Sequence, residues 1–310
     1  MRRTGPRAEM THLDSSWLQI HPEVGTALAE GRPIVTLESA VITHGLPRPI
    51  NLELARRMQA EVRKAGAVPA IAAVLDGVAK LGLTPEELER LSLDEQPVKI
   101  SRRDFSWSRA TGRSGGTTVA GGMIMARAAG VRVFATGGIG GVHRGDGMDV
   151  SADLPELAQT PVAVVCSGAK AILDLPRTIE WLETAGVPVV GYETDELPGF
   201  YSRESGLPIS ARADTPEEVA GILRAHWELP SAGGLLIGVP CPESDAIPFD
   251  VVQEALQRAA TEARNVSGPA LTPFLLSRMS EFTDGRSLRA NLALLRNNAR
   301  VAAGIAVALK

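Results

Sequence analysis

Short runs of apolar residues alternate along the chain with segments in which apolar residues recur every three or four positions. Runs that are apolar almost without interruption are typical of parallel strands covered on both faces. Such runs predict strands at 33–37, 69–75, 131–135, 161–166, 187–192 and 234–239. The segments between them predict helices at 51–65, 85–92, 117–129, 171–185, 216–227, 249–264 and, as one long helix or two shorter ones, 288–309. This alternation predicts an α/β fold with a mainly parallel central sheet and helices on both faces.

The domain organisation is inferred from the length of the chain and from the positions of possible linkers. A chain of 310 residues can form one large α/β domain or two small ones. We find no internal repeat and no clear linker, and the proline-rich stretch 239–248 is interpreted as a loop. The basic start, over 1–16, lacks the apolar stretch of a secretory signal and is expected to be a disordered tail. The sequence therefore predicts a single α/β domain over 17–310.

Composition narrows the classes of function. The net charge of −4 disfavours general binding to nucleic acid or to a membrane surface. No apolar run reaches the roughly 20 residues that a membrane span needs. The two cysteines, Cys166 and Cys241, make neither a disulfide framework nor a metal-ligand spacing, which fits a reducing cytoplasm. We therefore expect a cytoplasmic protein whose partner is a small molecule.

Unusual polar residues cluster where the predicted strands end. Glu38 follows the first strand, the glycine-rich stretch 137–145 follows the third, and Lys170 follows the fourth. In open α/β sheets, ligands bind at the carboxyl ends of the strands, which lie along one edge. The sequence therefore predicts an active site at the C-terminal strand ends.

Two segments are candidates for holding an anion such as a phosphate. The loop after the third strand combines five glycines with Thr136, His143 and Arg144, and glycine lets backbone N–H groups approach a ligand closely. Thr117 and Thr118 open a helix whose first N–H groups also suit an oxyanion, although they serve equally well as simple helix caps.

Lys170 and Glu38 are the candidates for covalent and acid catalysis. A lysine at the mouth of an apolar sheet, if desolvated, offers the free amine that imine chemistry needs, although a surface lysine at a helix start is the simpler reading. A carboxyl group directly after a buried strand can serve as an acid, or merely cap the next turn. His44 is interpreted as a structural histidine, and a late helix carries Asn291 and Asn298, at least one of which is expected to face the site.

Asp149 and Asp153 lie four residues apart with Ser151 between them. Oxygen ligands of this kind suit Mg²⁺ or Mn²⁺, but Ser151 or Asp153 can instead cap a helix beginning near 154. Lys99, Arg102 and Arg103 form a basic group that suits a phosphate or is simply solvated.

Taken together, these residues and the stretches around them resemble the motifs of a known protein family. The matching stretches are Leu37-Glu-Ser-Ala-Val-Ile-Thr-His-Gly-Leu-Pro47, Val74-Leu-Asp-Gly77, Ser101-Arg-Arg-Asp104, Gly116-Thr-Thr-Val119, Phe134-Ala-Thr-Gly-Gly-Ile-Gly-Gly-Val-His-Arg-Gly145, Asp149-Val-Ser-Ala-Asp153, Cys166-Ser-Gly-Ala-Lys170 and Asn297-Asn-Ala299. They run from about Val35 to the C-terminus, and their combination resembles the pseudouridine-5′-phosphate glycosidase family, also called the indigoidine-synthesis A-like family.

The resemblance implies a role for each matching position. It implies that Glu38 is the proton donor, Lys170 the covalent nucleophile and Asp149 the ligand of one Mn²⁺ per subunit, largely through water. It implies substrate contacts from Lys99, Val119, Ser151, Ala152 and Asp153, with His143 and Asn291 or Asn298 as further candidates. It also implies a homotrimer. Thr117, Thr118 and Thr136 are substrate-binding candidates from their own segments.

The activity implied by the resemblance is reversible cleavage of the C–C glycosidic bond of pseudouridine 5′-phosphate to uracil and ribose 5-phosphate. The expected route is acid-assisted opening of the ribose ring followed by a lysine–ribose imine. Two other functions remain open at this point: a Schiff-base aldolase or other sugar-phosphate lyase, which would share Lys170, and a sugar-phosphate-binding protein without catalysis.

Overall fold

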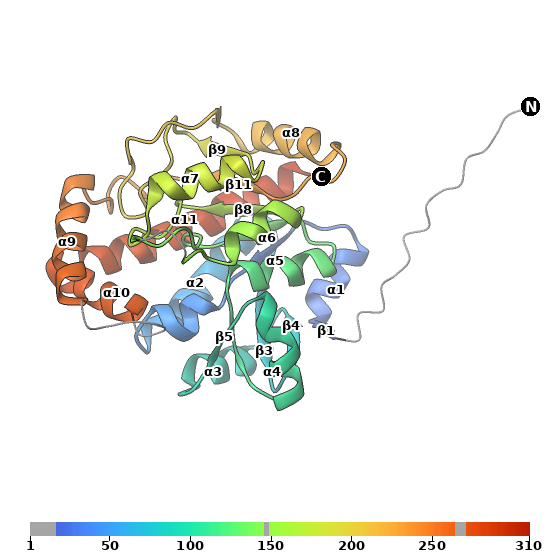
Figure 1. The fold of residues 1–310 in the computed structure, drawn as a ribbon. Coiled ribbons are helices and arrows are strands. Elements are labelled where there is room, and N and C mark those ends of the chain that lie inside the picture. The colour runs from blue at the N-terminus through green and yellow to red at the C-terminus, as the bar shows by residue number, and fades with distance from the viewer. Residues whose placement is uncertain (1–16, 146–148, 264–270) are drawn as a thin grey trace, which may run out of the picture.

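The computed structural model describes residues 17–145, 149–263 and 271–310 (Figure 1). The predicted tail over 1–16 lies outside the described residues. Within the described part of the chain, no helix is both long and apolar enough to cross a membrane.

A mixed, mostly parallel sheet of eleven strands is the centre of the described structure. The strands follow the order β1-β4-β3-β2-β7-β8-β11-β9-β10, with β6 beside β3 and β5 beside β6. Their bounds are β1 (Leu18–Ile20), β2 (Ile34–Leu37), β3 (Val68–Leu75), β4 (Val78–Leu81), β5 (Val98–Ile100), β6 (Gly115–Thr117), β7 (Val133–Ala135), β8 (Ala163–Cys166), β9 (Val189–Tyr192), β10 (Ala211–Ala213) and β11 (Leu235–Gly238). All contacts from β3 through β2 to β10 are parallel, which confirms the predicted α/β class.

The six predicted strands are all present, as β2, β3, β7, β8, β9 and β11, and the structure adds five short ones. Strand β3 explains most of the additions, because its two halves have different partners. Its first half pairs in parallel with β2, whereas its second half pairs antiparallel with β4 and β6. This small mixed extension, completed by β1 and β5, brings Lys99 on β5 to the edge of the parallel sheet.

Helices cover both faces of the sheet, as predicted. Their bounds are α1 (Pro22–Ala29), α2 (Ile50–Lys64), α3 (Pro85–Leu93), α4 (Phe105–Thr111), α5 (Val119–Ala128), α6 (Asp153–Gln159), α7 (Leu175–Thr184), α8 (Pro216–Trp227), α9 (Phe249–Glu262), α10 (Leu271–Phe282) and α11 (Arg286–Ala308). The long helix α11 packs on α2, α8, β2, β7 and β8, whereas α5 packs on β2, β3 and β7 from the other side. Figure 1 shows α5, α6 and α7 on the viewer's side of α11. Of the two alternatives predicted for 288–309, one long helix or two shorter ones, the structure has one long helix, α11.

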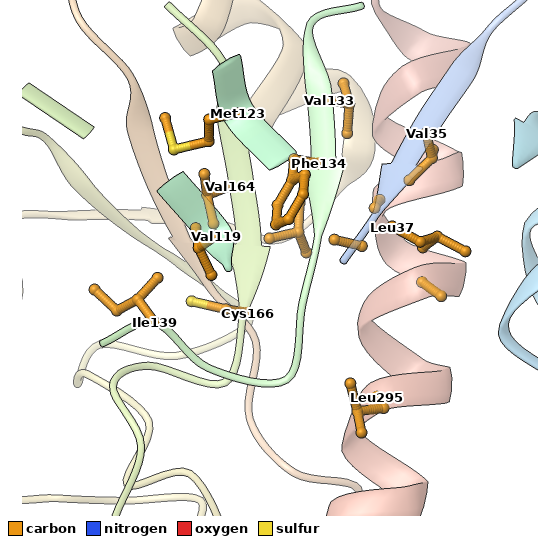
Figure 2. Packing of buried hydrophobic residues seen from close by; sticks show 14 of the residues in the cluster. Val35, Leu37, Val119, Met123, Val133, Phe134, Ile139, Val164, Cys166 and Leu295 are labelled. Carbon is orange, nitrogen blue, oxygen red and sulfur yellow. The ribbon is translucent and has the colours of Figure 1, made fainter. Parts of the chain in front are cut away.

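The core is tightest where α5 crosses β7. Phe134 is fully buried and lies among the side chains of Met123, Val119 and Val164 (Figure 2). A Cβ on Gly122 would lie 2.2 Å from the Phe134 ring, so glycine is required for this close approach. The start of α5 is thereby fixed against the end of β7, where the glycine-rich loop begins.

The loops that follow β7 and β8 are joined to each other. Ile139 and Ala169 form a parallel bridge, and the backbone N–H of Lys170 donates to the carbonyl of Ile139 at 3.0 Å. Helix α7 begins only at Leu175, after Asp174 caps it, so Lys170 lies in this joined loop and not at a helix start. The strand ends are therefore a fixed platform for the side chains that follow them.

Candidate active site

Three cavities follow one another along the carboxyl edge of the parallel strands. We call them the polar cavity, of 550 Å³, the middle cavity, of 90 Å³, and the outer cavity, of 390 Å³. The polar and middle cavities share Glu38, Ala40, Lys99 and Lys170. The middle and outer cavities share His44, Gly45, Leu276 and Asn291. The two residues predicted to carry the chemistry therefore lie together, at the junction of the first two cavities.

Glu38 is a buried carboxyl group, only 4% exposed, directly after β2. Burial raises its pKa, against the opposing effects of the Lys170 charge and of a hydrogen bond from Thr136. The Thr136 hydroxyl donates to Oε1 of Glu38. Because Oε1 accepts this bond, Oε2 is the oxygen left to carry a proton. The raised pKa keeps the acid protonated to a higher pH than in an exposed glutamate.

Lys170 lines both the polar and the middle cavity. Its amine makes no hydrogen bond or ion pair within the described part of the chain, whereas its backbone is held by Ile139. Lys99 faces the same space from β5 and is open to the solvent of the cavity. Surrounding protein lowers the pKa of Lys99, and the nearby positive charge of Lys170 acts in the same direction. The site thus holds two amines, of which Lys170 is fixed closer to the strand ends.

The start of α5 borders the polar cavity. Thr118 caps the helix, its hydroxyl accepting from the N–H of Gly121 at 3.3 Å, and Asp153 accepts from the N–H of Ala120 at 2.9 Å. The N–H of Val119 has no partner among the described residues. A free N–H at a helix start beside Lys99 is a suitable place for a phosphate oxygen.

Asp153 joins the helix start to the glycine-rich loop. Its second oxygen accepts from the N–H of Gly140 at 2.7 Å, and the side chain is buried. Ser151 accepts from the N–H of Asp153 at 3.2 Å, but the N-cap of α6 is Ala152 and no side chain caps this helix, so the capping alternative was wrong for both Ser151 and Asp153. Ser151, Ala152 and Asp153 all line the polar cavity. A Cβ on Gly140 would lie 2.1 Å from the Ser151 hydroxyl, which explains a glycine there.

Asp149 and His143 form the opposite rim of the polar cavity. The Asp149 side chain is 76% exposed, and its Oδ2 lies 3.8 Å from Nδ1 of His143. No group of three potential ligands among His, Cys, Asp and Glu exists in the described residues. A single exposed carboxylate fits a hard ion that keeps most of its water and is completed by substrate oxygens. The residues therefore fit Mn²⁺ or Mg²⁺ in this hydrated form only.

The two arginines of the basic group, Arg102 and Arg103, differ in whether a buried carboxylate binds them. Arg102 makes two hydrogen bonds, of 2.7 and 2.8 Å, to the buried carboxylate of Glu156, so its charge is already paired. Arg103 lines the polar cavity with a side chain that is 90% exposed. Of the two arginines, Arg103 is the one available to an anion in solution.

Some candidate residues lie behind the cavities rather than in them. The Thr117 hydroxyl donates to the carbonyl of Ala72 at 2.9 Å, and the Val119 side chain is fully buried in the core. Asn298, from α11, donates to the carbonyl of Thr136 at 2.9 Å and bonds the Ser167 hydroxyl. Asn298 therefore ties together the ends of β7 and β8, which carry Thr136 and Lys170.

Several lining residues escaped sequence reasoning. Phe200, Leu276 and Leu295 form apolar walls of the middle cavity. Apolar residues in helices and loops carry no signal that separates a cavity wall from the core. His44, expected to be structural, bonds the Thr43 hydroxyl at 2.6 Å but also lines the middle and outer cavities.

Comparisons with known proteins identify the family of the chain. The family described as indigoidine synthase A-like protein matches residues 23–308. Proteins named pseudouridine-5′-phosphate glycosidase are 54% identical in Methylobacterium nodulans, over 94% of this chain and 88% of that protein, and 52% identical in Solibacter usitatus, over 94% and 99%.

Solved structures give the same result. An indigoidine synthase A-like protein from Thermotoga maritima has a TM-score of 0.86 at 38% identity, covering 94% of this chain and 95% of that one. A prealnumycin C-glycosynthase in complex with ribulose 5-phosphate has a TM-score of 0.88 at 40% identity, covering 95% and 97%. From these matches over nearly its whole length, the chain belongs to the indigoidine synthase A-like family, which includes the pseudouridine-5′-phosphate glycosidases.

Proposed function

We propose that this protein is a pseudouridine-5′-phosphate glycosidase, which reversibly converts pseudouridine 5′-phosphate and water to uracil and ribose 5-phosphate. The observation that carries the proposal is the position of Glu38 and Lys170. Both line the junction between a polar cavity with free cations and a middle cavity with apolar walls. A sugar phosphate fits the first cavity and a flat base the second.

The chemistry of the substrate explains why an acid and an amine are needed. The leaving atom is a ring carbon with no lone pair to protonate, so the two-carboxylate route of ordinary glycosidases does not serve. Glu38 instead protonates the ribose ring oxygen, and the sugar opens into conjugation with the base. The raised pKa of Glu38 keeps this proton bound to a higher pH than in an exposed glutamate.

Lys170 completes the cleavage. Its amine, in the neutral form, adds to C1′ of the opened sugar, and a proton delivered to the base carbon lets the C–C bond break. Uracil leaves, and a lysine–ribose imine remains. Water then adds to the imine, so that Lys170 is released and ribose 5-phosphate forms. One water is consumed and no oxidant or reductant is required.

The remaining residues bind and orient the substrate. The Val119 N–H, the Thr118 hydroxyl and Lys99 would hold the phosphate, whose binding energy keeps the sugar in place. Asp149 would hold a hydrated Mn²⁺. The ion would place a positive charge beside the oxygens of the substrate. In the middle cavity, the side chain of the buried Asn291 makes no hydrogen bond within the described part of the chain and would pair with the edge of the base.

Assembly and location follow from the resemblance and from the cysteines. We propose a homotrimer, which light scattering of the purified protein would show as three times the 32.7 kDa chain mass. Cys166 and Cys241 are both buried and unpaired, which supports a reducing, cytoplasmic setting.

Borohydride trapping is the decisive test. Reduction in the presence of ribose 5-phosphate should add one sugar phosphate to Lys170, located by peptide mass spectrometry. Lys170→Arg, which keeps the charge but cannot form an imine, should show no adduct and lose more than about 10⁴-fold in kcat. Uracil release, followed by absorbance, separates this function from an aldolase, which would form the imine without needing a base. Binding of substrate with no uracil release would instead indicate a protein without catalysis.

A further inference from the structure

The outer cavity is the largest feature at the site to which the proposed reaction gives no role. It has 390 Å³ against 90 Å³ for the middle cavity, and it begins where the middle cavity ends. Asn291 and His44 line both, so the two spaces adjoin at these side chains. Leu276 on α10 borders both as well, and the outer cavity continues to Ser277, which is exposed.

The order of the cavities determines which part of a base reaches the outer one. Lys170 and Glu38 lie where the middle cavity meets the polar cavity, so the glycosidic carbon of a base must face that end. The opposite edge of the ring then faces Asn291 and the outer cavity. A substituent on that edge would point past Asn291 and His44 toward the outer cavity.

The lining of the outer cavity indicates which charge and polarity such a substituent should have. Hydroxyls of Ser280 and Ser287 alternate with the apolar surfaces of Leu46, Leu288 and Tyr201. No lysine, arginine, aspartate or glutamate is among the described lining residues. Burial lowers the pKa of His44, so this residue too is neutral at neutral pH. The cavity therefore suits a neutral group with apolar surface and hydrogen-bonding capacity, unlike the polar cavity.

We propose that the outer cavity is a subsite for neutral substituents on the base, so that the enzyme also cleaves and forms C-ribosyl 5-phosphates whose base extends beyond a bare pyrimidine. The inference rests on the proposed function. The reacting bonds are unchanged: the C1′–carbon bond breaks, the base carbon gains a proton, and water releases the sugar from Lys170. The substituent takes no part in these steps.

The test uses pseudouridine 5′-phosphates that carry methyl, propyl or benzyl groups on either ring nitrogen of the base. Each series keeps one ring N–H for recognition. We expect at least one series to be cleaved with kcat/KM within about tenfold of the unsubstituted substrate, which is the lower end of what one misfitting methylene costs in an apolar pocket. Rejection of both series, methyl included, by an enzyme that cleaves the parent would overturn the inference.

Ser280→Trp locates the effect, because it places a large ring in the outer cavity. It should lower kcat/KM for the propyl and benzyl substrates by about 10–200-fold and leave the parent nearly unchanged. Glu281→Trp, an exposed neighbour on α10 that is not a lining residue, is the matched control. Leu288→Trp fills the same cavity from α11 and replaces Ser280→Trp if that variant fails to fold.

Two other outcomes are distinguishable. If Ser280→Trp slows the parent as much as the substituted substrates, the cavity is a passage for the base and not a subsite. If the wild type fails to cleave even the parent, the proposed function itself is wrong, and the subsite is lost with it.

Discussion

The two sides of the polar cavity differ in how they are built. The inner side presents Glu38, which Thr136, Ser167 and Asn298 support from behind the cavity; all four are buried and joined through hydrogen bonds. The outer side, with His143 and Asp149, is open: the Asp149 side chain is 76% exposed, against 4% for Glu38. Both sides follow strand ends of the same sheet, so the difference lies in what covers them.

The difference indicates that the two sides of the cavity have different functions. Buried, hydrogen-bonded groups hold one geometry, and burial raises the pKa of Glu38, as a proton donor requires. Exposed groups cannot impose such shifts, but they exchange ions and ligands readily. We therefore expect variants of the inner side to lower kcat, and variants of the outer side to weaken metal or substrate binding.

Glu38→Gln should give the largest effect of the variants that test this division. Glutamine keeps the size and can still accept from Thr136, but it has no proton to give, so kcat should fall by about 10²–10⁴-fold. In the wild type, burial raises the pKa of Glu38, and activity should fall as pH rises through that pKa. A kcat–pH profile that keeps this falling limb in Glu38→Gln would show that another group is the acid.

The same substitution has an opposite effect on stability. A carboxyl whose pKa is raised in the folded state contributes stability at low pH, and this contribution is lost as pH rises through the folded-state pKa. Glu38→Gln should therefore unfold at a higher temperature than the wild type at neutral pH. The gain should vanish at a pH below the ordinary pKa of glutamate, which thermal melts over a pH series would check.

Asp149→Asn tests the open side. An aspartate that holds Mn²⁺ largely through water acts as an outer-shell partner, for which loss of the charge weakens metal affinity by about 10–100-fold. Electron paramagnetic resonance of free Mn²⁺ gives the affinity without reference to turnover. The melting temperature should not change, because the side chain is exposed. Equal loss in Glu243→Gln, an exposed carboxylate that lines none of the cavities described, would contradict a specific site at Asp149.

The sequence could predict the inner side well and the open side only in part. Strands β2, β7 and β8 are buried on both faces, so their patterns are continuous and their ends, with Glu38 and Lys170, can be placed. Strands β5 and β6 have only three residues each and form by pairing with each other and with β3. No local pattern encodes such pairing, so the position of Lys99 next to Lys170 was not predictable from its own segment.

Asn298 shows another limit of sequence reasoning. An asparagine in an apolar helix predicts a buried hydrogen-bonding role, but not its partners, which lie more than 130 residues away along the chain. The apolar walls of the middle cavity are a stronger case. Phe200 and Leu295 are chemically the same whether they pack against protein or against a bound base. Only the folded structure distinguishes these two situations.

Asn298→Ala tests whether the inner side owes its geometry to this asparagine. The substitution leaves the buried carbonyl of Thr136 and the Ser167 hydroxyl without this partner, which should cost about 1–3 kcal/mol of unfolding free energy. We expect kcat to fall, with KM nearly unchanged, because Asn298 acts through Thr136 and the β8 end. Asn297→Ala, on the same helix but bonded only to Arg300, is the control. A loss of stability with unaltered kcat and an unaltered kcat–pH profile would reduce Asn298 to a structural residue.

Arg103→Ala should give the smallest effect. It tests on the open side whether variants there weaken substrate binding without changing kcat. Its charge is 90% exposed and only 3.6 Å from Asp104, so it is screened by salt and contributes little to stability. Because it is exposed and lines the polar cavity, it should still attract a phosphorylated substrate. KM should therefore rise a few-fold at low ionic strength, with kcat and melting temperature unchanged, and the difference should disappear as salt is added. A change in kcat instead would place Arg103 in contact with the reacting sugar and would move part of the chemistry to the exposed side.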